Sequence, residues 1–208
     1  MEKNNFKKED AGCDKYGSQR LELAVYLRDH VLDDLHKEWF IENGTLLGAW
    51  RNGKFIEKDD DFDIALLIHS KDECHQLYNI ITKQLINSKY KARLINTYAS
   101  KIEIYDESYG KYNLIGKAYN NHDYHYVTLD IQFYLKINDN QYNKLYYINP
   151  SNKTFRINKN ILLPVGKIEL EKEMFNAPAK IEEVLKDNYG SLDPNASYNS
   201  KTGFYEIE

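Results

Sequence analysis

The sequence predicts an α+β fold built around a mixed β-sheet that carries acidic side chains. Residues 19–68 alternate helical and strand-like patterns in the order helix, strand, helix, strand. Residues 90–148 then contain several short runs with the period-two alternation of antiparallel strands. Helices followed by a run of antiparallel strands are typical of α+β proteins. The 208 residues are enough for one domain with its own hydrophobic core.

The N-terminal part holds the clearest patterns. Residues 1–18 are polar and contain glycine, which predicts a mobile leader. Residues 19–37 place leucine and valine at helical spacing, so we expect an amphipathic helix there. The run 38–42 predicts a strand, and residues 46–50 begin a second helix. A strand follows through residues 62–68, where the apolar run is nearly continuous.

The remaining elements follow in order along the chain. A further amphipathic helix is predicted over residues 72–88. Short strands are predicted at residues 90–96, 101–105, 112–116, 124–135, 145–148 and 168–170, with a polar turn over 138–144. A last helix is expected at about 178–188, and Gly190 is positioned to serve as its C-cap.

Composition and charge exclude several classes of protein. The net charge of −4 offers no basic excess for binding phosphates, so we expect no nucleic-acid partner. Cys13 and Cys74 are too few for a disulfide framework and predict free thiols in a reducing compartment. No apolar run approaches the ~20 residues of a membrane span, and residues 1–10 lack the apolar core of a signal peptide. The prediction is a cytoplasmic protein without a transmembrane segment.

The most informative pattern is an acidic cluster at the start of the strand predicted over 62–68. Asp61 and Asp63 stand two residues apart, so on a strand both carboxylates project from one face, roughly 7 Å apart. Burying two unpaired carboxylates costs free energy, which a divalent cation offsets. Paired acids of this kind commonly hold Mg²⁺ against substrate phosphates. The same pattern also occurs in ordinary turns, so its meaning depends on its neighbours.

Gly44 and Thr45 supply such a neighbouring feature. They lie between the predicted strand 38–42 and the predicted helix 46–50, at the strand-to-helix turn. Free backbone N–H groups and the positive end of the helix dipole at that position form a phosphate cradle. A phosphate cradle beside a cation-binding strand indicates chemistry on a nucleotide.

A third carboxylate, Asp130, lies on the predicted strand 124–135. Apolar residues of this strand face one way, and Asp130 shares the other face with Thr128 and Gln132. If this strand lies beside that of Asp63, three carboxylates converge, enough to hold cations or to orient an attacking hydroxyl. The alternative is a solvated Asp on the polar face of an edge strand, and the spacing leaves both interpretations open.

One stretch of the chain resembles the signature of the LicD/fukutin family, whose pattern reads GTLLGxxR-x-G-x-FI-PW-DDD-x-DI. The matching residues are Gly44–Ala49, Arg51, Gly53, Phe55–Ile56 and Asp59–Ile64. Looser similarity, in the order found in the family, continues through Leu129–Ile131, Leu163–Pro164, Ile168, Leu170–Glu171, Pro178, Leu185 and Tyr189–Gly190. The resemblance covers residues 21–190, nearly the whole chain.

The resemblance implies a nucleotidyltransferase-like fold, with helices flanking the mixed sheet and a β-rich insertion. It implies a single domain over residues 19–195, followed by a tail over 196–208. It also implies an enzyme that uses Mg²⁺, or Mn²⁺, to transfer a phosphorylated alcohol such as phosphocholine or ribitol phosphate. The implied partners are a CDP-linked donor (a CDP-alcohol) and a glycan hydroxyl as acceptor. The oligomeric state stays open.

The family pattern assigns a role to each matching residue. Asp61 and Asp63 would be the metal-binding pair, and Asp130 the third acid of the metal-binding and catalytic set. The other assignments are contacts to donor phosphates for Gly44, Thr45 and Arg51, and supporting roles around the acids for Lys58, Asp59 and Asp60.

Three points leave the chemistry open. The family's Pro-Trp before the acids is Glu57-Lys58 here, so the identity of the donor is uncertain. The same carboxylates also suit transfer of a nucleoside monophosphate from a nucleoside triphosphate to a small molecule, sugar or protein. A third possibility is a relative that binds a nucleotide or glycan without catalysis. The three acids and the Gly-Thr pair argue against it, because packing does not demand them.

Overall fold

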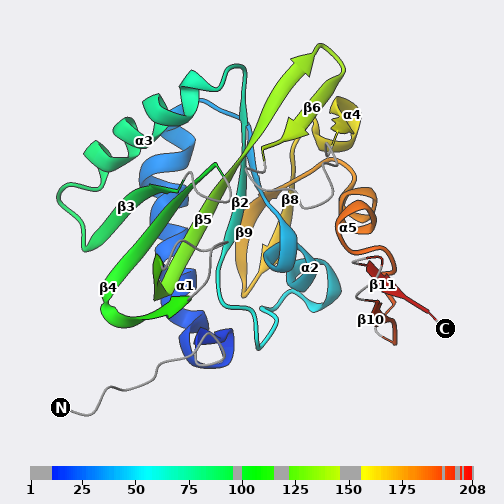
Figure 1. Cartoon of the computed structure of the whole chain (residues 1–208), viewed down its shortest axis with the longest axis horizontal. Coiled ribbons are helices and arrows are strands. Elements are labelled where there is room, and N and C mark those ends of the chain that lie inside the picture. Colours follow the sequence, from blue (N-terminus) through cyan, green and yellow to red (C-terminus); the bar gives the residue numbers. More distant parts are fainter. Residues whose placement is uncertain are drawn as a thin grey trace.

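The structure is a computed structural model that describes residues 11–95, 100–114, 122–145, 156–193, 195–199, 202 and 204–207. It confirms the predicted α+β class (Figure 1). In chain order the elements are α1 (Cys13–Leu27), a π-helical turn η2 (Arg28–Leu32), a 3₁₀ turn η3 (Asp33–Leu35), β1 (Trp39–Ile41), α2 (Asn43–Asn52), β2 (Asp63–Ile68), α3 (Asp72–Gln84), β3 (Tyr90–Ile95), β4 (Lys101–Leu114), β5 (His122–Asn138), β6 (Gln141–Lys144), β7 (Arg156–Asn158), α4 (Lys159–Leu162), β8 (Gly166–Leu170), β9 (Glu173–Ala177), α5 (Ile181–Tyr189), β10 (Ser197–Asn199) and β11 (Phe204–Glu206).

In the part of the chain that the structure describes, a seven-stranded mixed sheet forms the centre. Its strand order is β1-β2-β5-β4-β3, and β6 and β7 continue it from β5. β2 and β5 are parallel, whereas β1 with β2, β5 with β4, and β4 with β3 are antiparallel. Because parallel neighbours need a crossover connection, the chain passes through α3, β3 and β4 before β5 returns beside β2. β5 is an interior strand of the sheet, because β2 lies on one side of it and β4 on the other.

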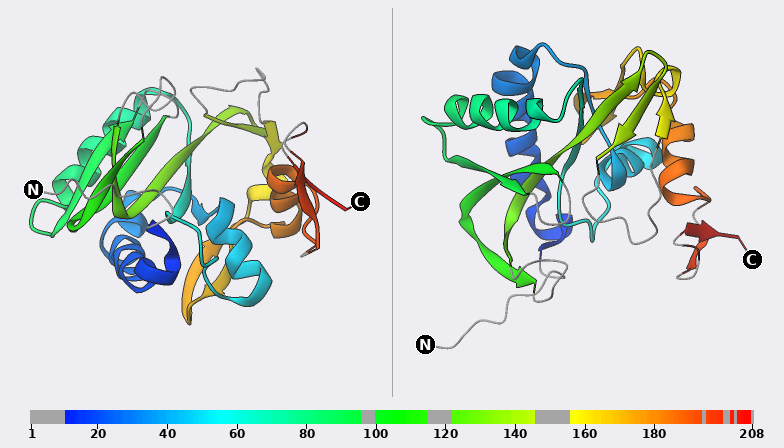
Figure 2. Two further views of the ribbon diagram at one scale, coloured as in Figure 1. Left: turned by 60° about the horizontal axis from the view of Figure 1, so that its bottom comes forward. Right: turned by 45° about the horizontal axis from the view of Figure 1, so that its top comes forward.

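The main hydrophobic core lies between this sheet and the helices behind it in Figure 1. α1 contributes Leu23 and Leu27, and β5 contributes Val127 and Leu129 from the apolar side of its alternating pattern. α3 packs against β3 and against η2. Elsewhere, α5 packs against α2, and the hairpin of β8 and β9 packs against β1. Figure 2 shows α5 and β11, in orange and red, at the end of the molecule opposite α3.

The N-terminal elements differ from the prediction in where they begin. α1 starts at Cys13, so the predicted mobile leader over 1–18 is too long; residues 1–10 lie outside the described part. The reason is a tertiary contact, since Cys13 N donates to Asp59 O at 2.9 Å. α2 likewise starts at Asn43 and not at residue 46. Gly44 therefore lies in the first helical turn and not in a turn before the helix.

Strand boundaries also differ from the prediction. The predicted strand 101–105 and residues 112–114 of the predicted strand 112–116 belong to one strand, β4, whose pairing with β5 shifts register between Asp106 and Lys111; residues 115 and 116 lie outside the described part. β6 occupies part of the predicted polar turn at 138–144, because it pairs with β5 on one side and β7 on the other. The predicted strand 145–148 falls largely outside the described residues.

The C-terminal part follows the prediction more closely. α5 ends at Tyr189, and Gly190 is its C-cap, with φ of 76° and its N–H bonded to Lys186 O at 2.8 Å. Glycine suits this position because a positive φ strains other residues. The predicted tail contains the antiparallel pair β10 and β11. Ser191 N donates to Tyr205 O at 2.8 Å, which ties β11 to the end of α5.

Candidate active site

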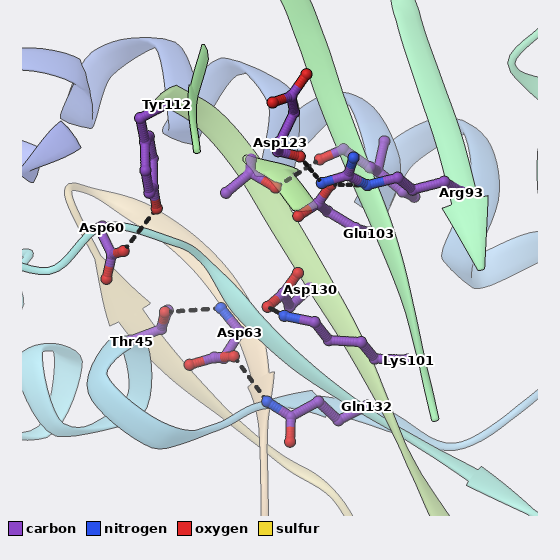
Figure 3. Close-up of polar contacts among 12 residues, drawn as sticks. Thr45, Asp60, Asp63, Arg93, Lys101, Glu103, Tyr112, Asp123, Asp130 and Gln132 are labelled. Atoms are coloured by element: carbon purple, nitrogen blue, oxygen red, sulfur yellow. Dashed lines mark hydrogen bonds and ion pairs between the residues drawn. The ribbon is translucent and has the colours of Figure 1, made fainter. Parts of the chain in front are cut away.

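Charged residues form a row across one face of the sheet. Asp63 of β2 and Asp130 of β5 are direct register partners in the parallel pair. Asp130 also stands opposite Glu103 of β4, which in turn stands opposite Arg93 of β3. Figure 3 shows these side chains on a common face. The interpretation of Asp130 as a solvated residue of an edge strand is wrong, because β5 is an interior strand and Asp130 is buried.

Asp61 joins two of these acids in a compact group. One carboxylate oxygen each from Asp61, Asp63 and Asp130 lie within 4.8 Å of one another. Asp61 occupies a bend immediately before β2 and not the strand itself, yet its carboxylate reaches the same place. Asp59 and Asp60 form a second such group with Asp61. The structure thus brings together the acids that the sequence predicted, with Asp61 shared by both groups.

Burial and mutual repulsion make these carboxylates unusually reluctant to ionise. Burial, followed by the charges of Asp130 and Asp60, raises the pKa of Asp61 to about 7. Burial and Asp61 raise the pKa of Asp59 to about 7 and that of Asp63 well above its usual value. Burial also raises the pKa of Asp130. The carboxylates of such a cluster repel one another when ionised, and a bound cation reduces this repulsion.

The unsatisfied oxygens of the cluster fit a divalent cation. Among the described residues, Asp130 Oδ1 and Asp59 Oδ2 are buried and have no hydrogen-bond partner. Buried polar atoms are nearly always paired, so these two oxygens call for a ligand. Carboxylate oxygens are the donors that Mg²⁺ and Mn²⁺ prefer. The donor set of Asp61, Asp63 and Asp130 therefore suits either ion.

The start of α2 lies directly against this cluster. Thr45 is buried, and its Oγ1 accepts a hydrogen bond from Asp63 N at 2.9 Å, which ties α2 to the start of β2 (Figure 3). Gly44 lies against Asp59, since a Cβ added to Gly44 would overlap the Asp59 carboxylate. Gly48 similarly admits Lys54 O, which a Cβ would overlap. Because Gly44 and Gly48 have no side chain, the loop between α2 and β2 can pack directly against α2.

Arg51 and Lys58 are not joined to the acids. Arg51 is exposed in the last turn of α2, about 9 Å along the helix axis from Thr45. Within the described residues, no hydrogen bond or ion pair links Arg51 to the cluster. Lys58 is exposed and pairs with Asp14 at 2.6 Å. Asp60, by contrast, accepts a hydrogen bond from the hydroxyl of Tyr112 at 3.1 Å.

Two residues beside the acids were not assigned a role from the sequence. Lys101 of β4 forms an ion pair with Asp130 Oδ2, and Gln132 Nε2 donates to Asp63 Oδ1 at 2.9 Å (Figure 3). The alternation of β5 already placed Gln132 on the face of Asp130. No sequence pattern pointed to Lys101, because its contact with Asp130 depends on how β4 pairs with β5.

A second buried ion pair, between Glu42 and Lys144, lies near Asp63. Glu42 is fully buried, and its Oε2 accepts from Lys144 Nζ at 2.7 Å and from the Tyr134 hydroxyl at 2.9 Å. Lys144 also donates to Asn43 Oδ1 at 3.0 Å, and Asn43 has a positive φ of 48°. The sequence signal for this pair was Glu42, a charged residue that directly follows the apolar residues of β1. The network holds the first residue of α2.

Tyr189 also comes close to the acids from the end of α5. Burial, and then the charges of Asp63 and Asp59, raise the pKa of its phenol. Its position in the family-like Tyr-Gly pair was noted from the sequence, but its proximity to the acids depends on how α5 packs against α2.

In the described part of the chain, no helix has the length and apolarity that crossing a bilayer requires.

Comparison with known proteins identifies the family. Residues 36–180 match the family described as LicD/FKTN/FKRP, nucleotidyltransferase domain. A comparison with curated proteins finds no match. The matched segment covers more than half of the chain and contains Asp61, Asp63 and Asp130. Proteins of this family are generally transferases. The chain belongs to the LicD/FKTN/FKRP family through its nucleotidyltransferase domain.

Proposed function

We propose that this protein transfers a phosphorylated alcohol, of the phosphocholine or ribitol-phosphate type, from a CDP-linked donor to a glycan hydroxyl. The observation that carries the proposal is the convergence of Asp61, Asp63 and Asp130 within 4.8 Å inside a domain of this family. These three residues would hold Mg²⁺ or Mn²⁺. When bound, the cation supplies positive charge that neutralises the donor diphosphate.

The start of α2 is the proposed contact for the donor phosphates. Gly44 and Thr45 lie in its first turn, where unbonded N–H groups and the helix dipole favour an anion. The Thr45 hydroxyl accepts a hydrogen bond from Asp63 N and keeps its own O–H as a donor, so Thr45 would offer both this O–H and its backbone N–H. Arg51 lies in the last turn of α2, so it would contact only a part of the donor that reaches beyond that turn. Lys58, Asp59 and Asp60 would shape the charge around the acids.

Asp130 is the proposed acceptor of the hydroxyl proton. Its Oδ1 is buried and has no hydrogen-bond partner among the described residues, so this oxygen can accept the proton of a hydroxyl placed beside the cation. The acceptor oxygen forms a bond to the phosphorus next to the alcohol, the bond from that phosphorus to the CMP oxygen breaks, and the proton passes to Asp130. Most of the acceleration would come from positioning and charge neutralisation.

A product assay by mass spectrometry tests the proposal. The protein is incubated with Mg²⁺ or Mn²⁺, a mixed glycan pool, and either CDP-choline, CDP-ribitol, CDP-glycerol, CTP, ATP or UTP. Release of CMP with a matching mass gain on a glycan supports the proposal and names the donor. Asp63→Asn should abolish the product. Asp139→Asn is the matched control, since the side chain of Asp139 is 95% exposed.

Other outcomes of the same assay are also informative. Release of diphosphate from a nucleoside triphosphate would replace the proposal with transfer of a nucleoside monophosphate. If no product forms, thermal stabilisation by a nucleotide that requires Mg²⁺ would indicate that the acceptor is missing from the pool. Absence of both product and stabilisation would contradict the proposal.

A further inference from the structure

Beside the acidic row, a second pair of polar side chains lies on the same face of the sheet. Lys101 of β4 and Gln132 of β5 are register partners. They lie two residues along their strands from Glu103 and Asp130, so all four project from one face. Lys101 is 8% exposed, and Figure 3 shows it and Gln132 reaching toward the acids.

Each member of this pair holds one oxygen of a different acid. Lys101 reaches from β4 to Asp130 Oδ2 on β5. Gln132 reaches from β5 to Asp63 Oδ1 on β2, at 2.9 Å. The other oxygen of Asp130, Oδ1, is buried and has no hydrogen-bond partner among the described residues. Each contact thus crosses from one strand to the next.

We propose that Lys101 and Gln132 are positioning residues of the cation site. By holding one oxygen of Asp130 and of Asp63, they orient the second oxygen toward the place that the two acids share with Asp61. This inference rests on the cation site of the proposed function. The terminal torsion of a carboxylate is broad, whereas Mg²⁺ demands nearly ideal geometry from its ligands. Groups that orient ligands in this way typically contribute 10- to 100-fold to metal affinity.

A role for Lys101 in charge compensation alone makes the opposite prediction. The ammonium group offsets one of the three carboxylate charges in the group of Asp61, Asp63 and Asp130. If that were its whole role, removing it would leave a more negative site and tighten Mg²⁺ binding. If it orients Asp130, removing it weakens Mg²⁺ binding. The direction of the change in affinity therefore separates the two roles.

Gln132→Leu is the cleaner test because it changes no charge. The dissociation constant of Mg²⁺ is measured calorimetrically on the full chain without donor or acceptor. We expect it to rise about tenfold. The melting temperature of the metal-free protein should fall slightly, because the buried Asp63 Oδ1 loses its donor. Gln76→Leu, an exposed glutamine on α3, is the matched control and should bind as the wild type does. A Gln132→Leu constant within about twofold of wild type would overturn the role of Gln132.

Lys101 is tested with two variants. Lys101→Met should weaken Mg²⁺ binding about tenfold, and Lys101→Arg, which keeps donors for Asp130 Oδ2, should recover most of the loss. Lys83→Met, at an exposed lysine in the last turn of α3, controls for the loss of a positive charge. Tighter binding by Lys101→Met would show that Lys101 only compensates charge and would overturn its positioning role.

The measurement is independent of group transfer, so the two proposals can fail separately. A wild-type protein that binds Mg²⁺ but transfers no phospho-alcohol would contradict the proposed function and leave this inference standing. A wild-type protein that transfers, alongside variants that bind Mg²⁺ normally, would contradict this inference alone. A wild-type protein that binds no Mg²⁺ would overturn it as well. Circular dichroism of each metal-free variant verifies that the fold is retained.

Discussion

Asp63 and Asp130 face each other as register partners in the parallel pair of β2 and β5, although they are far apart in the sequence. Both are buried. Lys101 forms an ion pair with Asp130 Oδ2, and Gln132 Nε2 donates a hydrogen bond to Asp63 Oδ1. The charge of Asp130 is one cause of the raised pKa of Asp63. This relationship connects the sheet topology to the proposed chemistry, since the pairing of β2 with β5 creates the site.

Replacing Asp63 separates its cost to the fold from its role in the site. Asp63→Asn removes a repelling charge, so the metal-free protein should become more stable by about 1 kcal/mol. The same variant should lose the stabilisation by Mg²⁺ and lower transfer at least about a hundredfold, more than groups that only orient ligands. Urea unfolding with and without Mg²⁺ measures the first two effects. A variant less stable than wild type without metal, or equally stabilised by Mg²⁺, would contradict the assignment.

Gly44→Ala should damage the site through Asp59. Alanine has the better helix propensity and would by itself add up to about 1 kcal/mol. Its Cβ, however, would overlap the Asp59 carboxylate, which must then move. We expect Mg²⁺ affinity to fall about tenfold and stability to fall by about 1 kcal/mol. Gly166→Ala is the control, because its Cβ would meet nothing within 4 Å. Unchanged Mg²⁺ affinity in Gly44→Ala would show that the position of Asp59 does not matter.

The buried pair of Glu42 and Lys144 should be strongly coupled. Lys144→Met leaves Glu42 as an unpaired buried charge and should cost about 3 kcal/mol or more. Adding Glu42→Gln should recover part of that loss, and a double-mutant cycle by urea unfolding measures the coupling.

A surface pair supplies the control for this cycle. Lys180 and Glu183 lie 2.9 Å apart with both side chains about half exposed, so their coupling should stay below about 1 kcal/mol. Equal coupling energies for the two pairs would mean that burial does not strengthen the contact of Lys144 with Glu42.

His125 should make stability depend on pH. Its ring stacks on Tyr105 with centroids 3.9 Å apart, and burial, with the charge of Arg93, lowers its pKa from 6.5 to about 4. Between these values the unfolded chain binds a proton that the folded chain does not. The stability contributed by neutral His125 is therefore fully present above pH 6.5 and is lost as pH falls toward 4.

His125→Phe keeps an aromatic ring and removes the titrating group. Across that window the wild type should lose on the order of 2 kcal/mol more than the variant, measured by urea unfolding at a series of pH values. The acids of the cluster have raised pKa values and act in the opposite direction, but they affect both proteins equally. Identical pH slopes in the two proteins would show that folding does not lower the pKa of His125.

The sequence alone predicted which residues form the candidate site. Asp61 and Asp63 are close together in the chain, and so are Gly44 and Thr45, which the structure places in the first turn of α2, so spacing and helix or strand periodicity were enough to single them out. The α+β class and the C-cap at Gly190 followed from equally local patterns. The fold class and the C-cap are confirmed, because each depends on a few neighbouring backbone angles and on the alternation of side chains.

The tertiary structure alone decided how those residues meet. The parallel pairing of β2 with β5 brings Asp130 to Asp63, and the register of β4 brings Lys101 to Asp130. The early start of α1 depends on a bond from Cys13 N to Asp59 O, which no local pattern encodes. Burial, and with it each raised pKa, comes from the packing of the whole sheet. Such contacts join residues distant along the chain, and strand order and register place them together.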